Sequence, residues 1–184
     1  LNPANLAAFV AWACLPGAWL SPGQWGADVL GALWFIALGG IVTRRVGRLD
    51  IGLAFLLSWA ALLAARLWWL DYAWDPGFAM WLRQCGNGAV LLFAFFMISD
   101  PLTTPRRRAM RIGYAAAVAL AAFAWQFGLY RPHGLIVALF AFSWLVPLLN
   151  RIADGAAFSW EQTRPGAIMR GSGALAQSVR AMES

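Results

Sequence analysis

Lysine is absent from this sequence of 184 residues, and all 14 of its basic residues are arginine. Charged residues make up only 12% of the chain, about half the share that soluble domains carry. Hydrophobic residues make up 61%, and the mean hydropathy is +0.63. So little charge excludes a water-soluble domain of ordinary composition and indicates a membrane protein.

Histidine and cysteine are also scarce. The chain has one histidine, His133, and two cysteines, Cys14 and Cys85, far apart in sequence. No CxxC, CxxCH or His–Cys cluster occurs, so zinc, iron–sulfur and c-type haem sites have no support. No serine or cysteine is paired with a base, and no glycine-rich phosphate loop occurs. The sequence therefore predicts neither catalytic residues nor a metal site.

The net charge of +6 raises the question of nucleic acid as a partner. The arginines, however, cluster beside apolar segments rather than along a soluble face. Membrane topology and anionic lipid headgroups explain that placement. The expected partners are therefore lipids and other membrane subunits, with no nucleic acid.

The apolar runs predict an all-α polytopic membrane protein with about five transmembrane helices. The expected spans are 25–43, 51–70, 78–99, 112–130 and 134–150. Before them, 4–15 is too short to cross a bilayer and predicts an N-terminal half-helix or short span, capped by Asn2. Residues 1–151 are expected to form the transmembrane domain, and 152–184 a cytoplasmic, largely disordered tail. Since no basic residue precedes Arg44, we expect further helices upstream rather than a signal peptide.

Five alternating spans place most of the arginines on one side of the membrane. On that side lie Arg44, Arg45, Arg48, Arg106, Arg107, Arg108, Arg111, Arg151, Arg164, Arg170 and Arg180. Only Arg131 falls on the other side, and Arg66 and Arg83 fall within spans. By the positive-inside rule the arginine-rich loops and the tail are cytoplasmic, as expected of a multi-pass protein of a bacterial inner membrane.

Polar residues at the ends of apolar runs are the candidates for a ligand site. They are Asn2, Asn5, Arg83, Asn87, Asp100, Thr103 and Thr104. Asp100 either ends a helix in an Asp-Pro turn and pairs with Arg106 to Arg108, or binds a cation or proton, or caps a half-helix. Arg83 either lies near the interface or forms a polar, helix-broken anion site with Asn87.

Two features of the spans bear on packing. Arg66 is expected to extend outward to an aromatic girdle at the membrane–water interface. A stripe of small residues runs down the fourth span and would allow close approach of a second helix. Its members are Ala117, Ala121, Ala124 and Gly128.

Three short segments, NPAN at 2–5, SPGQWG at 21–26 and FFMISDPLTTP at 95–105, resemble the RnfD/NqrB family. These proteins are membrane subunits of Rnf-type complexes and of sodium-translocating NADH:quinone oxidoreductases. The resemblance covers 1–151 as the C-terminal portion of such a subunit. It implies an α-helical fold with two inverted repeats, related to urea transporters, in a complex that couples electron flow to ion movement.

The family commonly carries FMN on a threonine in an SGAT-like motif, where this chain has SPGQ at 21–24. Covalent FMN is therefore expected to be absent. A noncovalent flavin or quinone remains a candidate, and the sequence does not identify the cofactor. The resemblance implies a scaffold subunit of an electron-transport assembly, at most a non-catalytic subunit of an oxidoreductase. The alternatives are a small-solute or ion permease with broken helices, and a purely structural subunit of a larger respiratory or photosynthetic complex.

Overall fold

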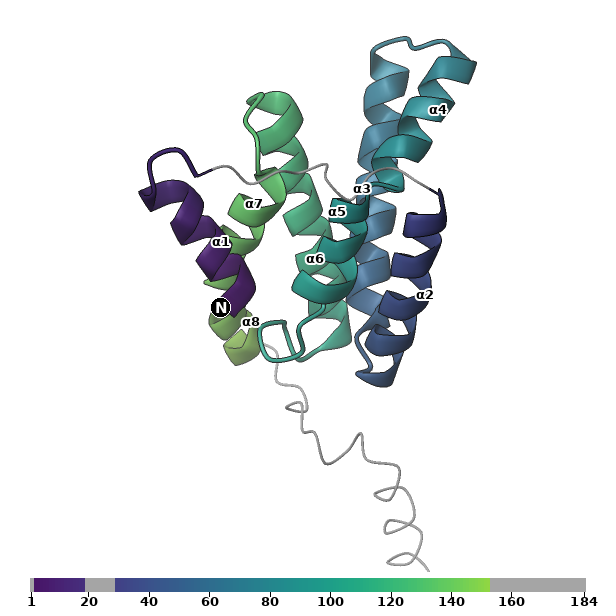
Figure 1. Cartoon of the computed structure of the whole chain (residues 1–184). Coiled ribbons are helices and arrows are strands. Elements are labelled where there is room, and N and C mark those ends of the chain that lie inside the picture. The colour runs from purple at the N-terminus through teal and green to yellow at the C-terminus, as the bar shows by residue number, and fades with distance from the viewer. Residues whose placement is uncertain (1, 19–28, 153–184) are drawn as a thin grey trace, which may run out of the picture.

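In the computed structural model, which describes residues 2–18 and 29–152, every regular element is helical (Figure 1). In chain order they are α1 (Pro3–Cys14), α2 (Val29–Arg45), α3 (Leu49–Trp69), α4 (Trp74–Cys85), α5 (Gly88–Leu92), the π-helical turn η1 (Phe93–Met97), α6 (Arg108–Phe123), the π-helical turn η2 (Ala124–Gly128), α7 (Gly134–Ser143) and α8 (Val146–Ile152). The all-α prediction is confirmed for this part of the chain. The segment 21–26 and the predicted tail from 153 onward lie outside the described residues.

Two helices in the described ranges are long and apolar enough to cross a membrane, Leu49–Trp69 and Arg108–Gly128, each of 21 residues. A third span results if Gly134–Ser143 and Val146–Ile152, which meet at 45°, count as one. Shorter apolar helices cover Pro3–Cys14 and Gly88–Met97. These elements coincide with three of the spans expected from the sequence and with the predicted N-terminal half-helix.

The expected span 78–99 is divided into two helices. The amide of Gly86 donates to the carbonyl of Leu82 at 2.8 Å, where α4 ends. The side-chain oxygen of Asn87 then accepts from the amide of Ala89 at 2.9 Å and caps α5. The polar residues in the middle of this apolar run thus start a new helix rather than interrupting one that continues.

The N-terminal helix begins as the sequence predicts. The side-chain oxygen of Asn2 accepts hydrogen bonds from the amides of Ala4 (3.0 Å) and Asn5 (3.1 Å), and Pro3 occupies the first helical position. Such a cap satisfies amides that have no partner within the helix, and proline costs nothing at this position because its missing amide would be unpaired anyway. Asn2 therefore fixes where α1 starts.

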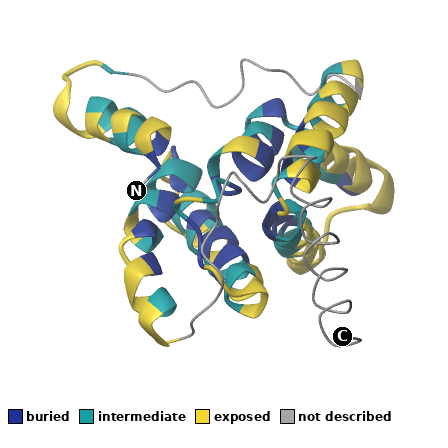
Figure 2. Cartoon of the chain, turned by 90° about the horizontal axis from the view of Figure 1, so that it is seen from below, coloured by how far each residue is buried: buried dark blue, intermediate teal, exposed yellow. Residues whose placement is uncertain are grey.

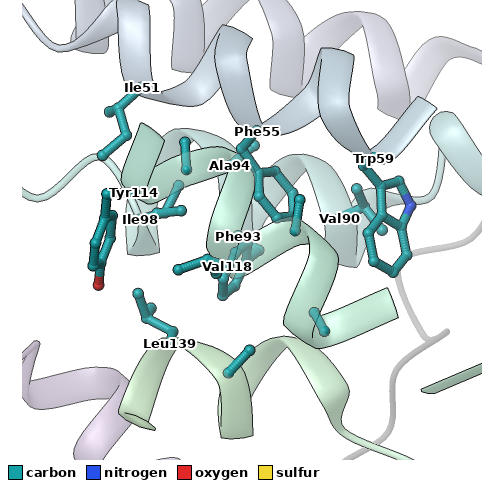
Figure 3. Packing of buried hydrophobic residues seen from close by; sticks show 14 of the residues in the cluster. Ile51, Phe55, Trp59, Val90, Phe93, Ala94, Ile98, Tyr114, Val118 and Leu139 are labelled. Carbon is teal, nitrogen blue, oxygen red and sulfur yellow. The ribbon is translucent and has the colours of Figure 1, made fainter. Parts of the chain in front are cut away.

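The buried core lies between α3, α6 and the α5–η1 segment, with α7 on the other side of α6 (Figure 3). On α3 the buried residues recur at every fourth position, which defines one face of the helix. They are Ile51, Phe55, Trp59 and Leu63, and Gly52 beside Ile51 is buried as well. Phe93 of η1 packs against Phe55, with ring centroids 4.9 Å apart. Aromatic side chains of α3 and η1 thus fill the centre of the bundle.

Small residues on α6 allow this close packing, but on a different face from the one expected. The buried alanines are Ala115, Ala119 and Ala122, whereas Ala124 and Gly128 are exposed. Of the predicted stripe, Ala117 and Ala121 are half-buried, and Ala121 packs against the core. Whether a second helix approaches along the stripe stays a prediction, because alanine occurs all around this helix and spacing alone does not select a face. The neighbouring Tyr114 and Val118, both buried, mark the face that packs.

Figure 2 shows exposed residues on the outer faces of the bundle, and many of the exposed residues are large hydrophobic ones. On α2 and α3, Trp34 and Leu57 are 65% and 70% exposed. An apolar exterior of this extent is unfavourable in water and suits contact with lipid.

Candidate functional site

The segment that joins η1 to α6, residues 98–107 and hereafter the tethered loop, is the candidate site. Its first turn is built around Asp100, whose Oδ1 accepts from the amide of Leu102 at 3.1 Å and whose Oδ2 accepts from the hydroxyl of Thr103 at 3.0 Å. The hydroxyl of Ser99 donates to the carbonyl of Phe95. Local side-chain bonds of this kind hold a turn where proline prevents a helix.

The start of α1 is bound directly to the tethered loop. The side-chain nitrogen of Asn2 donates to the carbonyl of Met97 at 3.2 Å and to Oδ2 of Asp100 at 3.4 Å. The structure therefore brings together two polar segments that the sequence identified separately. Of the candidate residues, Asn2, Asp100 and Thr103 form one connected group.

A second connection comes from Arg48, in the turn between α2 and α3. Its Nη1 donates to the carbonyl of Pro105 and its Nη2 to the carbonyl of Pro101, both at 3.4 Å. The side chain is buried, and burial is the main reason that its pKa lies below the usual value of an arginine. The positive charge of Arg111 lowers this pKa further, while Asp50 and Asp100 raise it.

The far end of the tethered loop is held by α3 and α8. Arg111, in the first turn of α6, donates to Oδ2 of Asp50 and, through Nη1, to the carbonyl of Arg106 at 2.7 Å. The amide of Arg106 donates to Oδ1 of Asn150 at 2.9 Å. Arg108 lies 3.8 Å from the same Asp50 oxygen. The interpretation that Asp100 pairs with Arg106 to Arg108 is wrong, because the carboxylate that meets this arginine segment is Asp50.

These contacts bring the arginine-rich segments to one end of the bundle. The arginine end, as we call it, comprises the C-terminus of α2, the N-termini of α3 and α6, α8 and the tethered loop (Figure 1). The sequence predicted that 44–48 and 106–111 share a side, and the structure places them at the same end. The sequence did not predict the roles of Arg48, Asp50 and Asn150. It indicated only a charged boundary before the second span, near Arg48 and Asp50, and the end of the last span at Asn150.

Arg83 and Asn87 do not belong to this group. Arg83 is exposed on α4, and the side-chain oxygen of Asn87 is engaged in capping α5. Within the described ranges, no hydrogen bond or ion pair joins either residue to the tethered loop. Arg66 lies with its guanidinium carbon 4.8 Å from the ring centroid of Phe127, so an aromatic partner is present, supplied by η2 rather than by the girdle beside it.

Asn5 and Thr104 are buried near the two ends of this network. Oδ1 of Asn5 and Oγ1 of Thr104 have no hydrogen-bond partner among residues 2–18 and 29–152. Buried polar atoms are nearly always satisfied in native proteins. Among the candidate residues, these two atoms are therefore available to form a hydrogen bond with a ligand or water.

Two hollows lie on the described surface. The aromatic pocket, about 330 Å³, lies between the C-terminal end of α3 and α4, and is lined by Ala64, Leu67, Trp68, Tyr72, Ala73, Trp74, Gly77, Phe78 and Trp81. The arginine pocket, about 500 Å³, lies between the tethered loop and the α7–α8 bend, and is lined by Leu102, Thr103, Arg106, Ser143, Val146, Pro147, Asn150 and Arg151.

The aromatic pocket has an ordered wall. The rings of Trp74 and Phe78 stack at 5.9 Å, and those of Phe78 and Trp81 at 6.1 Å. The indole nitrogen of Trp81 donates to the carbonyl of Ala60 at 2.8 Å and fixes α4 against α3. The sequence predicted an interfacial aromatic girdle here. The pocket itself depends on the turn that folds α4 back along α3.

Comparison with known proteins gives one family and one curated relative. The NQR2, RnfD, RnfE family matches residues 5–159. The chain is similar to a subunit of the ion-translocating oxidoreductase complex of Stutzerimonas stutzeri, with 30% identity over 130 residues, which are 71% of this chain and 34% of that protein. The chain thus spans about a third of the length of the relative it matches. No solved structure matches.

Proposed function

The chain belongs to the NQR2, RnfD, RnfE family, and on this premise we propose that it is a scaffold subunit within the membrane part of an ion-translocating electron-transport complex. The observation that carries the proposal is the attachment of the tethered loop to four helices. The contacts are made by Asn2 at the start of α1, Arg48 and Asp50 at the start of α3, Arg111 on α6 and Asn150 on α8. Irregular backbone at the end of a membrane helix persists where protein satisfies its polar groups. A loop fixed in this way suits a rigid frame for neighbouring subunits.

We propose the topology that the arginines favour. By the positive-inside rule, the arginine end would face the cytoplasm. The chain would cross the membrane about five times, with α1 as a half-helix. Three observations support this arrangement: the shared position of 44–48 and 106–111, the length of α3 and α6, and the apolar exterior. Position-specific labelling of single cysteines at Arg45 and Tyr130 in intact cells tests it. Labelling of both from the same side would contradict it.

For a noncovalent cofactor, the aromatic pocket fits a quinone ring better than the tethered loop does. Small-molecule sites are typically 300–1,000 Å³ and lined by aromatic residues with few polar groups, and this pocket of about 330 Å³ has the ring ladder of Trp74, Phe78 and Trp81. At the tethered loop most of the polar groups already bond to one another. The side chains of α3 and α4 would hold the ring by stacking, and the Tyr72 hydroxyl would supply a polar contact.

Gentle isolation of the native assembly tests the scaffold role. We expect the chain to co-purify with other membrane subunits and to yield no flavin fluorescence once it has been denatured and separated from them. Covalent flavin on the isolated chain would contradict the cofactor proposal. Purification as a lone protein that transports a solute in liposomes would contradict the scaffold and support a permease.

Two adjacent tryptophans test the quinone position. Trp68 and Trp69 are both 83% exposed, but only Trp68 lines the aromatic pocket. We expect Trp68→Leu to lower the quinone content of the purified assembly several-fold, because it removes a ring from the pocket wall. Trp69→Leu should leave the content unchanged. Equal losses in both variants would show that the tryptophans act on the membrane interface in general.

A further inference from the structure

Arg106 and Arg151 both line the arginine pocket, and their side chains have no hydrogen-bond or ion-pair partner among the described residues. No hydrogen bond or ion pair engages either guanidinium within residues 2–18 and 29–152, although Arg106 is bound through its backbone amide and carbonyl. The backbone bonds fix the position of Arg106 and leave its charge available. Two unpaired guanidinium groups at one hollow form a site for an anion.

The other residues of the pocket also favour an anionic ligand. Among residues 2–18 and 29–152, no carboxylate lines the pocket, and Asp100 turns its oxygens to Asn2, Leu102 and Thr103. Asn150 accepts from the Arg106 amide through Oδ1, so its amide nitrogen is left as a donor that no described residue uses. Arginine and amide donors together match the oxygens of a phosphate group.

Apolar side chains are exposed on the tethered loop and on α8, the two elements that supply these donors. Leu102 on the tethered loop is 71% exposed, and Leu148 and Ile152 on α8 are 52% and 68% exposed. The pocket wall itself includes Val146 and Pro147 at the α7–α8 bend. A free anion would gain nothing from these surfaces, whereas acyl chains would cover them. The combination of charged donors beside an apolar flank distinguishes a lipid from a dissolved ion.

We propose that the arginine pocket binds an anionic phospholipid, with its phosphate between Arg106 and Arg151 and its acyl chains along α8. The residues that line the pocket belong to the tethered loop, α7 and α8 or the bend between these helices. Figure 1 shows α8 at the arginine end of the bundle. Basic pockets between membrane helices are known to take anionic headgroups. The bound lipid would join the tethered loop to α8 in addition to the Arg106–Asn150 hydrogen bond. This inference does not depend on the proposed cofactor or partners.

Native mass spectrometry of the full chain in nonionic detergent, titrated with short-chain phosphatidylglycerol, tests the proposal. We expect Arg106→Gln and Arg151→Gln each to weaken binding about five-fold, and the double variant about 25-fold, because each arginine near such a headgroup contributes a similar electrostatic share. Both residues are exposed, and no described residue forms a hydrogen bond or ion pair with either guanidinium, so neither change should unfold the protein. A thermal unfolding curve recorded without lipid verifies this for every variant.

Arg107→Gln is the matched control, since Arg107 is exposed in the same loop but does not line the pocket. We expect its affinity for phosphatidylglycerol to stay within about two-fold of the parent, because a charge outside the pocket acts only through screened, longer-range attraction. An equal loss in Arg107→Gln would overturn the proposal in favour of diffuse attraction.

Two ligands separate the sources of the phosphate. Phosphatidylcholine should bind at least ten-fold more weakly than phosphatidylglycerol, because its headgroup carries no net charge, and equal binding would overturn the need for an anion. Inorganic phosphate should fail to displace phosphatidylglycerol at millimolar concentration, because it cannot cover the apolar flank. Displacement at that concentration would overturn the proposal that the occupant is a lipid and would indicate a site for a free anion.

Discussion

Arg111 reaches from the first turn of α6 to Asp50 in the first turn of α3, with its Nη2 and Nε 2.6 and 3.0 Å from the carboxylate oxygen Oδ2. Only 12% and 10% of the two side chains are exposed. The pair joins the two described helices that are long and apolar enough to cross a membrane, at the end where the tethered loop enters α6. Because the same arginine also donates to the carbonyl of Arg106, one guanidinium fixes both the helix register and the loop.

Removing the carboxylate should be more damaging than removing both charges. We expect Asp50→Asn to lower the free energy of unfolding by about 3 kcal/mol, because Arg111 is left charged and largely buried without a counter-ion. The double variant Asp50→Asn, Arg111→Met should recover part of this loss. Thermal unfolding in detergent gives the comparison.

Asp71→Asn is the control for that series, because Asp71 is exposed and has no ion pair among the described residues. It should change stability by less than about 0.5 kcal/mol. A double variant less stable than Asp50→Asn alone would show that the pair is not a coupled unit.

Close packing between α2 and η1 depends on Gly39. A Cβ added there would lie 2.5 Å from Cγ of Phe95, whereas a Cβ at the next residue, Gly40, meets nothing within 4 Å. Gly39→Ala should therefore destabilise the protein by about 1–3 kcal/mol through overpacking. Gly40→Ala should be neutral or stabilising by up to about 1 kcal/mol. Thermal unfolding of both variants is the measurement, and equal effects would place η1 farther from α2.

Local rules of sequence account for much of this structure. Asn2 followed by Pro3 predicts the start of α1, Pro101 and Pro105 predict the end of the preceding helix, and the apolar run after Arg48 predicts α3. Each of these inferences depends on residues within one helical turn of the feature. They required no knowledge of the partner helices.

The site could not be predicted by the same means. Its bonds join residues far apart in the chain: Asn2 to Asp100, Arg48 to Pro105, and Arg106 to Asn150. Charge clustering indicated that the arginines share an end, but not that Asp50 would receive Arg111. With four arginines between 106 and 111, sequence alone does not say which one has a partner and which is left for a ligand.

Asn2 has two separable roles, as the cap of α1 and as the connection to the tethered loop. Asn2→Ala removes both and should cost about 2 kcal/mol, with about half from the cap and half from the lost hydrogen bonds. Asn2→Ser keeps an acceptor for the amides of Ala4 and Asn5 but loses the amide donor, so its cost should be about half as large.

Trypsin cleavage after Arg106 or Arg107, both exposed, reports on the tethered loop. We expect faster cleavage in both Asn2 variants than in the parent, because each frees Met97 and Asp100 from α1. Unchanged cleavage in both would indicate that Arg48 and Asn150 hold the loop without help from α1.

The single histidine should give the unfolding free energy a dependence on pH. His133 caps α7 with left-handed backbone (φ 64°), and burial lowers its pKa below the usual 6.5. As the pH falls below about 6.5, the unfolded chain binds a proton more readily than the folded one, so stability decreases until the folded pKa is reached. His133→Asn, which tolerates this backbone conformation, should remove that part of the decrease between pH 7 and 5.

Tyr130→Asn, at another left-handed position (φ 53°) that is exposed, should keep the parent's profile. A His133→Asn protein with the parent's pH profile would mean that the imidazole titrates alike in the folded and unfolded chains.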